Sequence, residues 1–122
     1  HISDIGGLSV ARNLAAFCVF MGVRTAWHGP GDVSPIGHAV NMHLDLAVPN
    51  FGIQELALFP EETRAVFPGC PEVREGCMWP NDLPGWGVDL DERLAAQFPL
   101  PEDPLNGAWP EVRRLDGTVI RP

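Results

Sequence analysis

Three side chains capable of acid–base chemistry stand where the sequence predicts strands to end. His28 follows the apolar segment 23–27, and Glu55 closes a short apolar segment at 51–55. Asp32 comes four residues after His28, on the same loop, which contains glycine and proline. An imidazole and two carboxylates can exchange hydrogen bonds and protons, so this set could bind and process a small polar ligand.

The elements that would hold these side chains alternate between strand and helix across residues 1–59. Apolar residues at helical spacing indicate two helices, with Ser9 and Ser34 as N-caps and Gly22 just past the first helix. The expected order is a strand at 1–5, a helix at 8–21, a strand at 23–27, a helix at 34–47 and a strand at 51–55. Alternation of this kind predicts parallel strands joined by right-handed crossovers.

Parallel strands bring their carboxyl ends to one edge of a sheet, where α/β proteins place their functional groups. Adjacent strands lie about 4.8 Å apart, so side chains from successive strand ends can reach one small ligand. We therefore expect His28, Asp32 and Glu55 to meet at this edge. The first predicted strand would add His1, Ser3 and Asp4 to the same place.

Each candidate also has a purely structural interpretation. His28 could be a turn histidine, Asp32 could cap the following helix, and Glu55 could be a solvated or paired carboxylate. A metal site built from the same three residues is a weaker alternative, because the chain has no short ligand pair such as H-x-x-x-H. His38 and His43, five residues apart in a helix, do not share a face and predict packing rather than metal binding.

Residues 60–122 differ from the first part because they hold ten of the 13 prolines. Proline at this density favours loops with short helices. The expected elements are a short helix at 60–66, a helix at 88–98 that opens with the capping-box pair Asp89 and Glu92, and a hairpin around Asp116-Gly117. Because this set cannot close a barrel or complete a sheet, the chain is expected to be the C-terminal part of a larger α/β protein.

The charge balance restricts the partners. The chain has 8 Lys and Arg against 16 Asp and Glu, a formal net charge of −8. Clustered basic residues bind nucleic acids and anionic membranes, so neither is expected as a partner. No apolar run approaches the roughly 18 residues of a membrane span. Three cysteines without zinc-type spacing favour a reduced, cytoplasmic protein over one built on disulfides.

Four segments carry a resemblance to a known family. They are HISDIGGLSVARNLA, RTAWHGPGDVSPIGHAVNMHLDLAVPNFGIQE, PGWGVDLDE and RRLDGTVIRP. They resemble the C-terminal part of the mannonate dehydratase family of the enolase superfamily, which includes sugar-acid dehydratases and starvation-sensing proteins. The resemblance covers essentially the whole chain. It implies an α/β fold, with the last strand–helix units of a (β/α)7β barrel at 1–59 and a proline-rich segment at 60–122 that returns to a capping domain.

The resemblance also implies an activity, the Mg²⁺-dependent dehydration of D-mannonate or D-gluconate to 2-keto-3-deoxy-D-gluconate. A base removes the proton α to the carboxylate, Mg²⁺ stabilises the enediolate, and the 3-hydroxyl leaves as water. The residues that match His28, Asp32 and Glu55 contact the sugar acid in this family, and His28 and Glu55 are the catalytic candidates. The Mg²⁺ ligands are expected outside this chain, and the full-length protein is expected to be a homo-oligomer.

Two other hypotheses stand beside the enzyme. The full-length protein could be a non-catalytic, sugar-acid-binding regulatory homologue that keeps the site but lacks a competent base. Alternatively, the 122 residues could fold independently as an α+β module without a site. A part-barrel should expose its sheet edges and aggregate, whereas an independent module should unfold cooperatively as a monomer.

Overall fold

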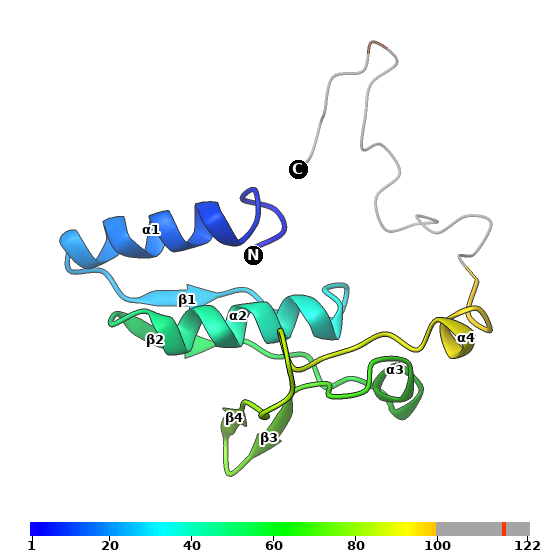
Figure 1. Cartoon of the computed structure of the whole chain (residues 1–122). Helices are drawn as coiled ribbons and strands as arrows, with labels where there is room; N and C mark the ends of the chain where they lie inside the picture. Colours follow the sequence, from blue (N-terminus) through cyan, green and yellow to red (C-terminus); the bar gives the residue numbers. More distant parts are fainter. Residues whose placement is uncertain (100–115, 117–122) are drawn as a thin grey trace.

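The computed structural model describes residues 1–99 and 116, and Figure 1 shows how their elements are arranged. A parallel strand pair with two long helices is followed by an antiparallel hairpin and two short helices. In chain order the elements are α1 (Leu8–Phe20), β1 (Thr25–Trp27), α2 (Pro35–Ala47), β2 (Phe51–Gln54), α3 (Glu61–Val66), β3 (Glu72–Arg74), β4 (Cys77–Trp79) and α4 (Glu92–Ala95). None of the helices in the described part has the length and apolar character needed to cross a membrane.

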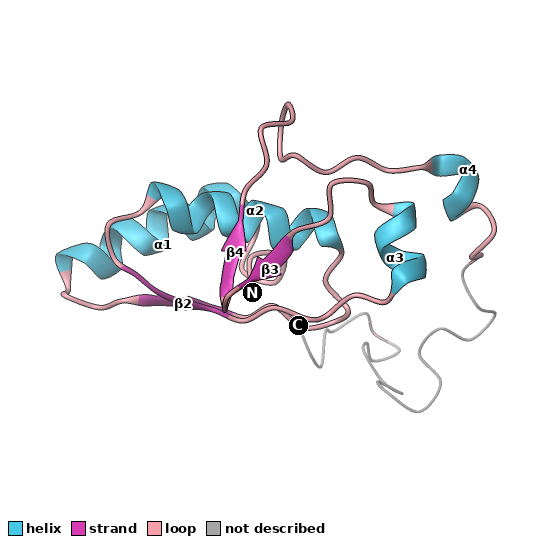
Figure 2. Ribbon diagram, turned by 90° about the horizontal axis from the view of Figure 1, so that it is seen from below, coloured by secondary structure: helices cyan, strands magenta, loops and turns pink. Residues whose placement is uncertain are grey.

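Helices α1 and α2 lie on the same side of the β1–β2 pair (Figures 1 and 2). Ala11 and Ala15 let α1 approach the sheet closely, and both are fully buried. They share one apolar cluster with Trp27 of β1 and Leu44 of α2. Burial of apolar surface contributes roughly 25 cal/mol of stabilising free energy per Å², and this contribution holds the helices against the strands. On the other face of β1, Ala26 is exposed.

The strand predicted at 1–5 is wrong, because this segment forms turns. The amide of Asp4 donates to the carbonyl of His1 at 3.0 Å, and the amide of Gly7 donates to the carbonyl of Ile2 at 2.8 Å. Such local bonds occupy the groups that a strand would offer to a neighbour. Gly7 also has a φ of 89°, a left-handed value that interrupts any extended segment before α1 begins.

The helix predicted at 8–21 is confirmed as α1, although its two ends differ in how well they were predicted. The N-cap is Gly7, and Ser9 lies inside the helix, so the predicted serine cap is wrong. At the other end Gly22 has a φ of 69°, as expected of a glycine just past a helix. The Val23 amide donates to the carbonyl of Cys18 at 2.8 Å, which is the hydrogen bond of a Schellman motif at a helix end.

Helix α2 begins where the sequence predicts. Ser34 is the N-cap, and its hydroxyl accepts a hydrogen bond from the Gly37 amide at 3.4 Å. Pro35 occupies the first helical position, where its missing N–H and fixed φ cost nothing. The helix ends at Ala47, two residues before Pro49, which restricts the residue ahead of it to extended backbone.

Strands β1 and β2 pair in parallel, as predicted, with Trp27 directly opposite Gln54. The Glu55 amide donates to the carbonyl of Trp27 at 3.3 Å and continues the ladder by one residue. This register places His28 and Glu55 side by side at the carboxyl ends of the two strands. The sheet has two strands in the described part, because the predicted first strand is absent.

The β3–β4 hairpin was not predicted. Glu75 and Gly76 connect its strands, with φ values of 53° and 75°. Two consecutive left-handed residues form the type I′ turn that matches the twist of a two-residue hairpin. The turn has Glu-Gly at the positions where type I′ hairpins usually have Asn-Gly or Asp-Gly. The sequence therefore lacks the dipeptide from which a hairpin would be predicted. The other predicted hairpin, around Asp116-Gly117, lies outside the described residues apart from Asp116 itself.

The short helix predicted at 60–66 is confirmed as α3, but the helix predicted at 88–98 is reduced to the single turn of α4. The N-cap of α4 is Asp91, whose carboxylate accepts from the Leu94 amide at 2.9 Å. The predicted capping by Asp89 is therefore wrong. Its carboxylate accepts instead from the amide of the next residue at 2.8 Å.

The cap of α2 gives a stability prediction. Ser34→Ala removes the acceptor of the Gly37 amide and should lower the free energy of unfolding by about 1 kcal/mol. Ser9→Ala is the matched control, because Ser9 is exposed within α1 and alanine there should be neutral or slightly stabilising. Urea unfolding followed by circular dichroism measures both variants, and equal losses would contradict the assigned cap.

Candidate active site

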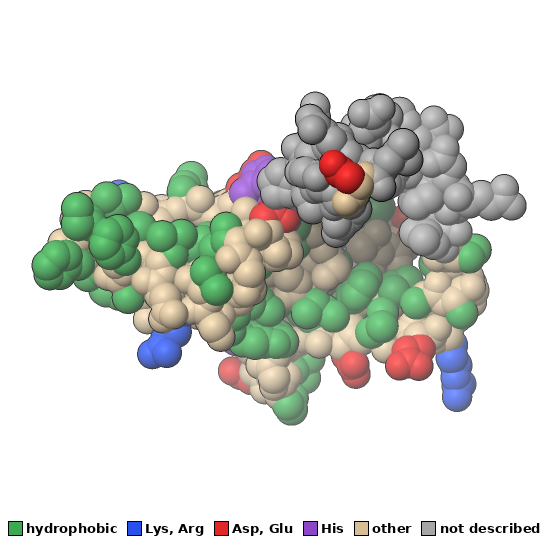
Figure 3. Space-filling view, turned by 90° about the horizontal axis from the view of Figure 1, so that it is seen from above, with side chains coloured by type: hydrophobic (Ala, Val, Ile, Leu, Met, Phe, Trp, Pro, Cys, Tyr) green, Lys and Arg blue, Asp and Glu red, His purple; other side chains and the backbone are tan. Residues whose placement is uncertain are grey.

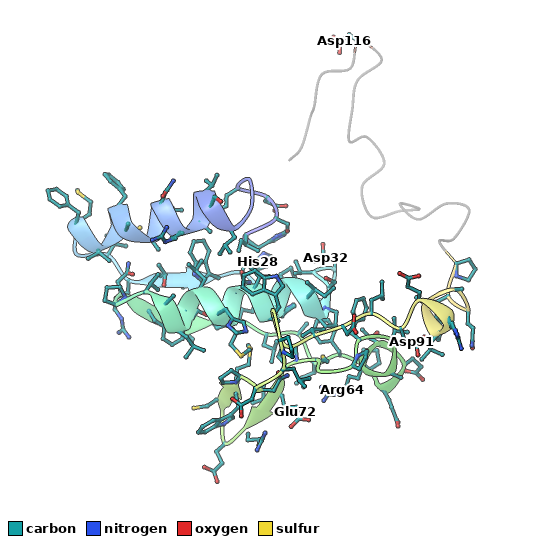
Figure 4. The ribbon with its side chains drawn as sticks, in the orientation of Figure 1. His28, Asp32, Arg64, Glu72, Asp91 and Asp116 are labelled. Atoms are coloured by element: carbon teal, nitrogen blue, oxygen red, sulfur yellow. The ribbon has the colours of Figure 1, made fainter. Side chains whose placement is uncertain are left out.

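His28 and Glu55 form a pair at the carboxyl ends of β1 and β2. Nε2 of His28 lies 3.4 Å from Oε2 of Glu55. Each side chain is 57% exposed, so the pair faces solvent and is accessible to a ligand. His28 is labelled in Figure 4, just past the end of β1. The structure thus brings together the two side chains that the strand order predicts to be neighbours.

Gly29 holds the strand ends at this separation. Its amide donates to Oε2 of Glu55 at 3.0 Å, the same oxygen that faces His28. A Cβ built on Gly29 would lie 2.0 Å from the carbonyl oxygen of Glu55 and 2.8 Å from Cε1 of His38. Any larger residue would therefore force the loop away from β2. In the sequence, the G-P-G segment after His28 indicated an unusual turn but did not indicate this close approach to β2.

His1 lies next to the pair. Its ring centroid is 5.4 Å from that of His28, with the planes tilted by 35°. Nδ1 of His1 is 2.6 Å from the hydroxyl of Ser3, and Nε2 is 3.0 Å from a carboxylate oxygen of Asp4. Both ring nitrogens are thus engaged, and His1 reaches His28 from a turn rather than from the predicted strand.

Asp32 is not brought into the pair. Its side chain is exposed and makes no hydrogen bond or ion pair with a described residue. Figure 4 shows it on the loop ahead of α2, apart from His28. The capping interpretation of Asp32 also fails, because Ser34 provides the cap of α2.

The described residues do not form a metal centre. Within residues 1–99 and 116, no group of three or more His, Cys, Asp or Glu side chains could hold a metal ion. His28 and Glu55 supply two donors and Asp32 stands apart, so the alternative of a metal site made from these three residues is not supported. Hard divalent cations such as Mg²⁺ require a larger set of oxygen ligands than this pair offers.

His38 has a larger part in the site than the sequence indicated. It is completely buried, and its Nε2 lies 3.1 Å from the carbonyl oxygen of Pro30. Burial lowers the pKa of His38, and the smaller upward effects of the Pro30 hydrogen bond and the Glu55 charge do not offset it. By contrast, His43 packs edge-on against Trp86, in keeping with the predicted packing role.

A separate cavity of about 590 Å³ lies between α2, β2 and the β3–β4 hairpin. Its lining is mainly apolar and includes Met42, Ile53 and Val73, with Asp45 among them. Both carboxylate oxygens of Asp45 are buried and have no hydrogen-bond partner among the residues that the structure describes. Burial raises the pKa of Asp45 from about 3.8 to about 7, so the acid is held partly protonated at neutral pH.

Comparison with known proteins places the chain in a family. Residues 1–94 match the family described as Enolase C-terminal domain-like, and the chain belongs to it. Over its whole length it is 54% identical to the D-galactonate dehydratase family member RspA of Pantoea ananatis and 52% identical to a D-galactonate dehydratase family member of Enterocloster bolteae. The chain spans only 29% and 30% of the length of these two relatives.

Solved structures agree with this placement. A crystal structure of an enolase from Pantoea ananatis with bound D-gluconate and Mg is similar with a TM-score of 0.79 and 57% identity, over 81% of this chain and 24% of that one. A mandelate racemase/muconate lactonizing enzyme from Jannaschia sp. CCS1 follows with a TM-score of 0.67 and 27% identity, over 75% and 23%. The fold is the C-terminal portion of an enolase-superfamily barrel. The resemblance to mannonate dehydratases in particular is not supported by these relatives.

The tight contact at Gly29 predicts a large effect from one methyl group. Gly29→Ala should destabilise the protein by about 1–3 kcal/mol, because the new Cβ collides with the Glu55 carbonyl. Gly31→Ala lies two residues away and is the matched control, since its Cβ would meet Ala57 at an ordinary 3.8 Å. Thermal unfolding of both variants tests this. Equal melting temperatures for the two would contradict the close approach.

The raised pKa of Asp45 predicts a pH-dependent stability. The folded chain binds this proton more tightly than the unfolded chain, so the stabilisation is full below about pH 4 and is lost as the pH rises through about 7. Asp45→Asn should remove this loss and leave the chain more stable than wild type at pH 8. Melting temperatures at pH 4.5 and 8 measure it, with the exposed Asp82→Asn as control. Parallel pH profiles for wild type and Asp45→Asn would contradict the prediction.

Proposed function

We propose that this chain supplies the last strand–helix units of a sugar-acid dehydratase, a hydro-lyase, and that His28, Glu55 and Asp32 contact the substrate. The observation that carries the proposal is the exposed pair of His28 and Glu55 at the ends of adjacent parallel strands, 3.4 Å apart. The Pantoea ananatis structure, 57% identical to this chain, holds D-gluconate and Mg and supports this class of ligand.

The chemistry of the pair suits the hydroxyl groups of a sugar acid. A carboxylate accepts hydrogen bonds from hydroxyls, and an imidazole can donate to one hydroxyl and accept from another. Glu55 already accepts from the Gly29 amide, which fixes one oxygen and leaves the other available to the ligand. His28 is the candidate for proton transfer, because an imidazole nitrogen can accept a proton and return it. Asp32 would reach a hydroxyl further along the sugar chain.

The metal and the substrate carboxylate belong to another part of the site. The described residues hold no metal cluster, and Glu55 and Asp32 would repel an anionic group. We therefore propose that Mg²⁺ and its ligands lie outside this chain. The residues described here would bind and orient the hydroxylated end of the substrate.

The proposed reaction removes the proton at C2 and expels the C3 hydroxyl as water. The enol that results becomes a 2-keto-3-deoxy acid. D-Gluconate and D-mannonate differ only at C2, and this centre becomes trigonal, so both would give 2-keto-3-deoxy-D-gluconate. D-Gluconate is the first substrate to test, because it is the sugar acid found in the similar structure.

Exposed apolar side chains support a larger protein around this chain. On α1 and just after it, Phe17, Phe20 and Met21 are 62%, 87% and 58% exposed, and Figure 3 shows hydrophobic side chains gathered at this end of the molecule. Contiguous apolar surface of this kind is normally covered by another segment or subunit. This exposed apolar surface argues against an independently folding module. We extend the proposal to a full-length enzyme that is homo-oligomeric and cytoplasmic.

Two substitutions in the full-length protein test the proposed roles. His28→Asn and Glu55→Gln each remove a hydrogen-bonding group that the substrate would meet, which typically costs about 1–3 kcal/mol, or roughly 5- to 150-fold in kcat/KM. Turnover of D-gluconate and D-mannonate with Mg²⁺ is the measurement. The exposed Glu62→Gln, on α3, is the control and should behave as wild type.

The same experiment separates the enzyme from the regulatory homologue. If the wild-type protein binds sugar acids without converting them, and both variants bind more weakly, the non-catalytic binder is correct and the dehydratase is wrong. If both variants turn over every tested sugar acid at the wild-type rate, His28 and Glu55 do not contact the substrate.

A further inference from the structure

His38 stands beneath the loop that carries His28, on the side away from solvent. It comes from the first turn of α2, its side chain is completely buried, and its ring packs edge-on against Phe59 with centroids 4.9 Å apart. A histidine in such a place carries a polar ring into an apolar setting, at a cost in desolvation that an aliphatic residue would avoid. The contacts of the ring show what offsets this cost.

The hydrogen bonds of His38 fix its tautomer. Nε2 lies 3.1 Å from the carbonyl oxygen of Pro30, which can only accept, so Nε2 must carry the proton. Nδ1 is buried without a partner among the described residues. A second proton there would be a buried donor with no acceptor, so the ring is neutral and donates through Nε2 alone. The Val33 amide donates to the same carbonyl at 3.2 Å.

The ring also forms one wall of the space around Gly29. A Cβ on Gly29 would be 2.8 Å from Cε1 of His38 and 2.0 Å from the Glu55 carbonyl oxygen. The His38 ring and the end of β2 therefore both lie against Gly29 where a side chain would begin, and they leave no room for one. In this position the Gly29 amide points at Oε2 of Glu55 and donates at 3.0 Å.

We propose that His38 is a positioning residue, which holds Pro30 and Gly29 so that the loop aligns His28 with Glu55. Its role rests on the proposed function of that pair. The Nε2 hydrogen bond sets the direction of the Pro30 carbonyl, and the ring sets the distance between Gly29 and Glu55. Loss of the donor would let the peptide rotate and would widen the 3.4 Å separation of the pair.

Two variants separate the hydrogen bond from the packing. His38→Gln keeps a donor close to the position of Nε2, whereas His38→Leu fills a similar volume without one. His43→Leu is the matched control, because His43 lies on the same helix and its ring packs against Trp86. In the full-length protein with D-gluconate and Mg²⁺, His38→Leu should lower kcat/KM by about tenfold or more. His38→Gln should recover to within about threefold of wild type, and His43→Leu should match wild type.

A second measurement does not depend on turnover. Crystal structures of the full-length His38→Leu and His38→Gln variants should show the Gly29–Glu55 hydrogen bond lost in the first and kept in the second. If leucine leaves both that bond and the pair unchanged, or if glutamine and leucine are equally impaired, the positioning role is wrong. If the protein converts no sugar acid but the bond is lost only with leucine, the positioning stands and the dehydratase fails.

Discussion

The site depends on the close crossing of two backbones at Gly29. Parallel pairing of β1 and β2 brings the strand ends to neighbouring positions, but pairing alone does not aim the side chains. The Gly29 amide meets the Glu55 carboxylate only because no Cβ separates the loop from β2. The buried ring of His38 lies against the same position of Gly29 and also leaves no room for a side chain there. An exposed polar pair is thus held in place by buried and closely packed residues.

The elements that could be predicted are those specified by local chemistry. Ser34 and Pro35 start α2 through a side-chain cap and a fixed φ, and both effects are complete within one helical turn. Gly22 ends α1 because a glycine accepts the left-handed conformation without strain. Once helices and strands alternate, parallel pairing follows, and with it the meeting of His28 and Glu55. This much of the candidate site was therefore available from the sequence.

The parts that could not be predicted depend on contacts across the chain. The segment 1–5 closes on itself through turns, and these local hydrogen bonds occupy groups that pairing with β1 would have needed. His38 had the pattern of an ordinary packed histidine, because its acceptor is a backbone carbonyl that no residue type reveals. The distance of Asp32 from the pair likewise follows from the path of the loop, which neither periodicity nor composition determines.

The negative charge of Glu55 and Asp32 restricts the direction in which an anionic ligand could bind. Two unit charges 4 Å apart interact by about 1 kcal/mol in water and about 4 kcal/mol near a protein surface. A sugar acid whose carboxylate faced Glu55 or Asp32 would meet a repulsion of this size, and the net charge of −8 adds to it. The same two residues attract hydroxyl protons. In the proposed enzyme, a sugar acid would therefore bind with its hydroxyl groups toward β1 and β2 and its carboxylate toward a cation supplied from elsewhere. The acidity of this chain, which argued against nucleic acid as a partner, in this way also sets the direction in which a sugar acid would bind.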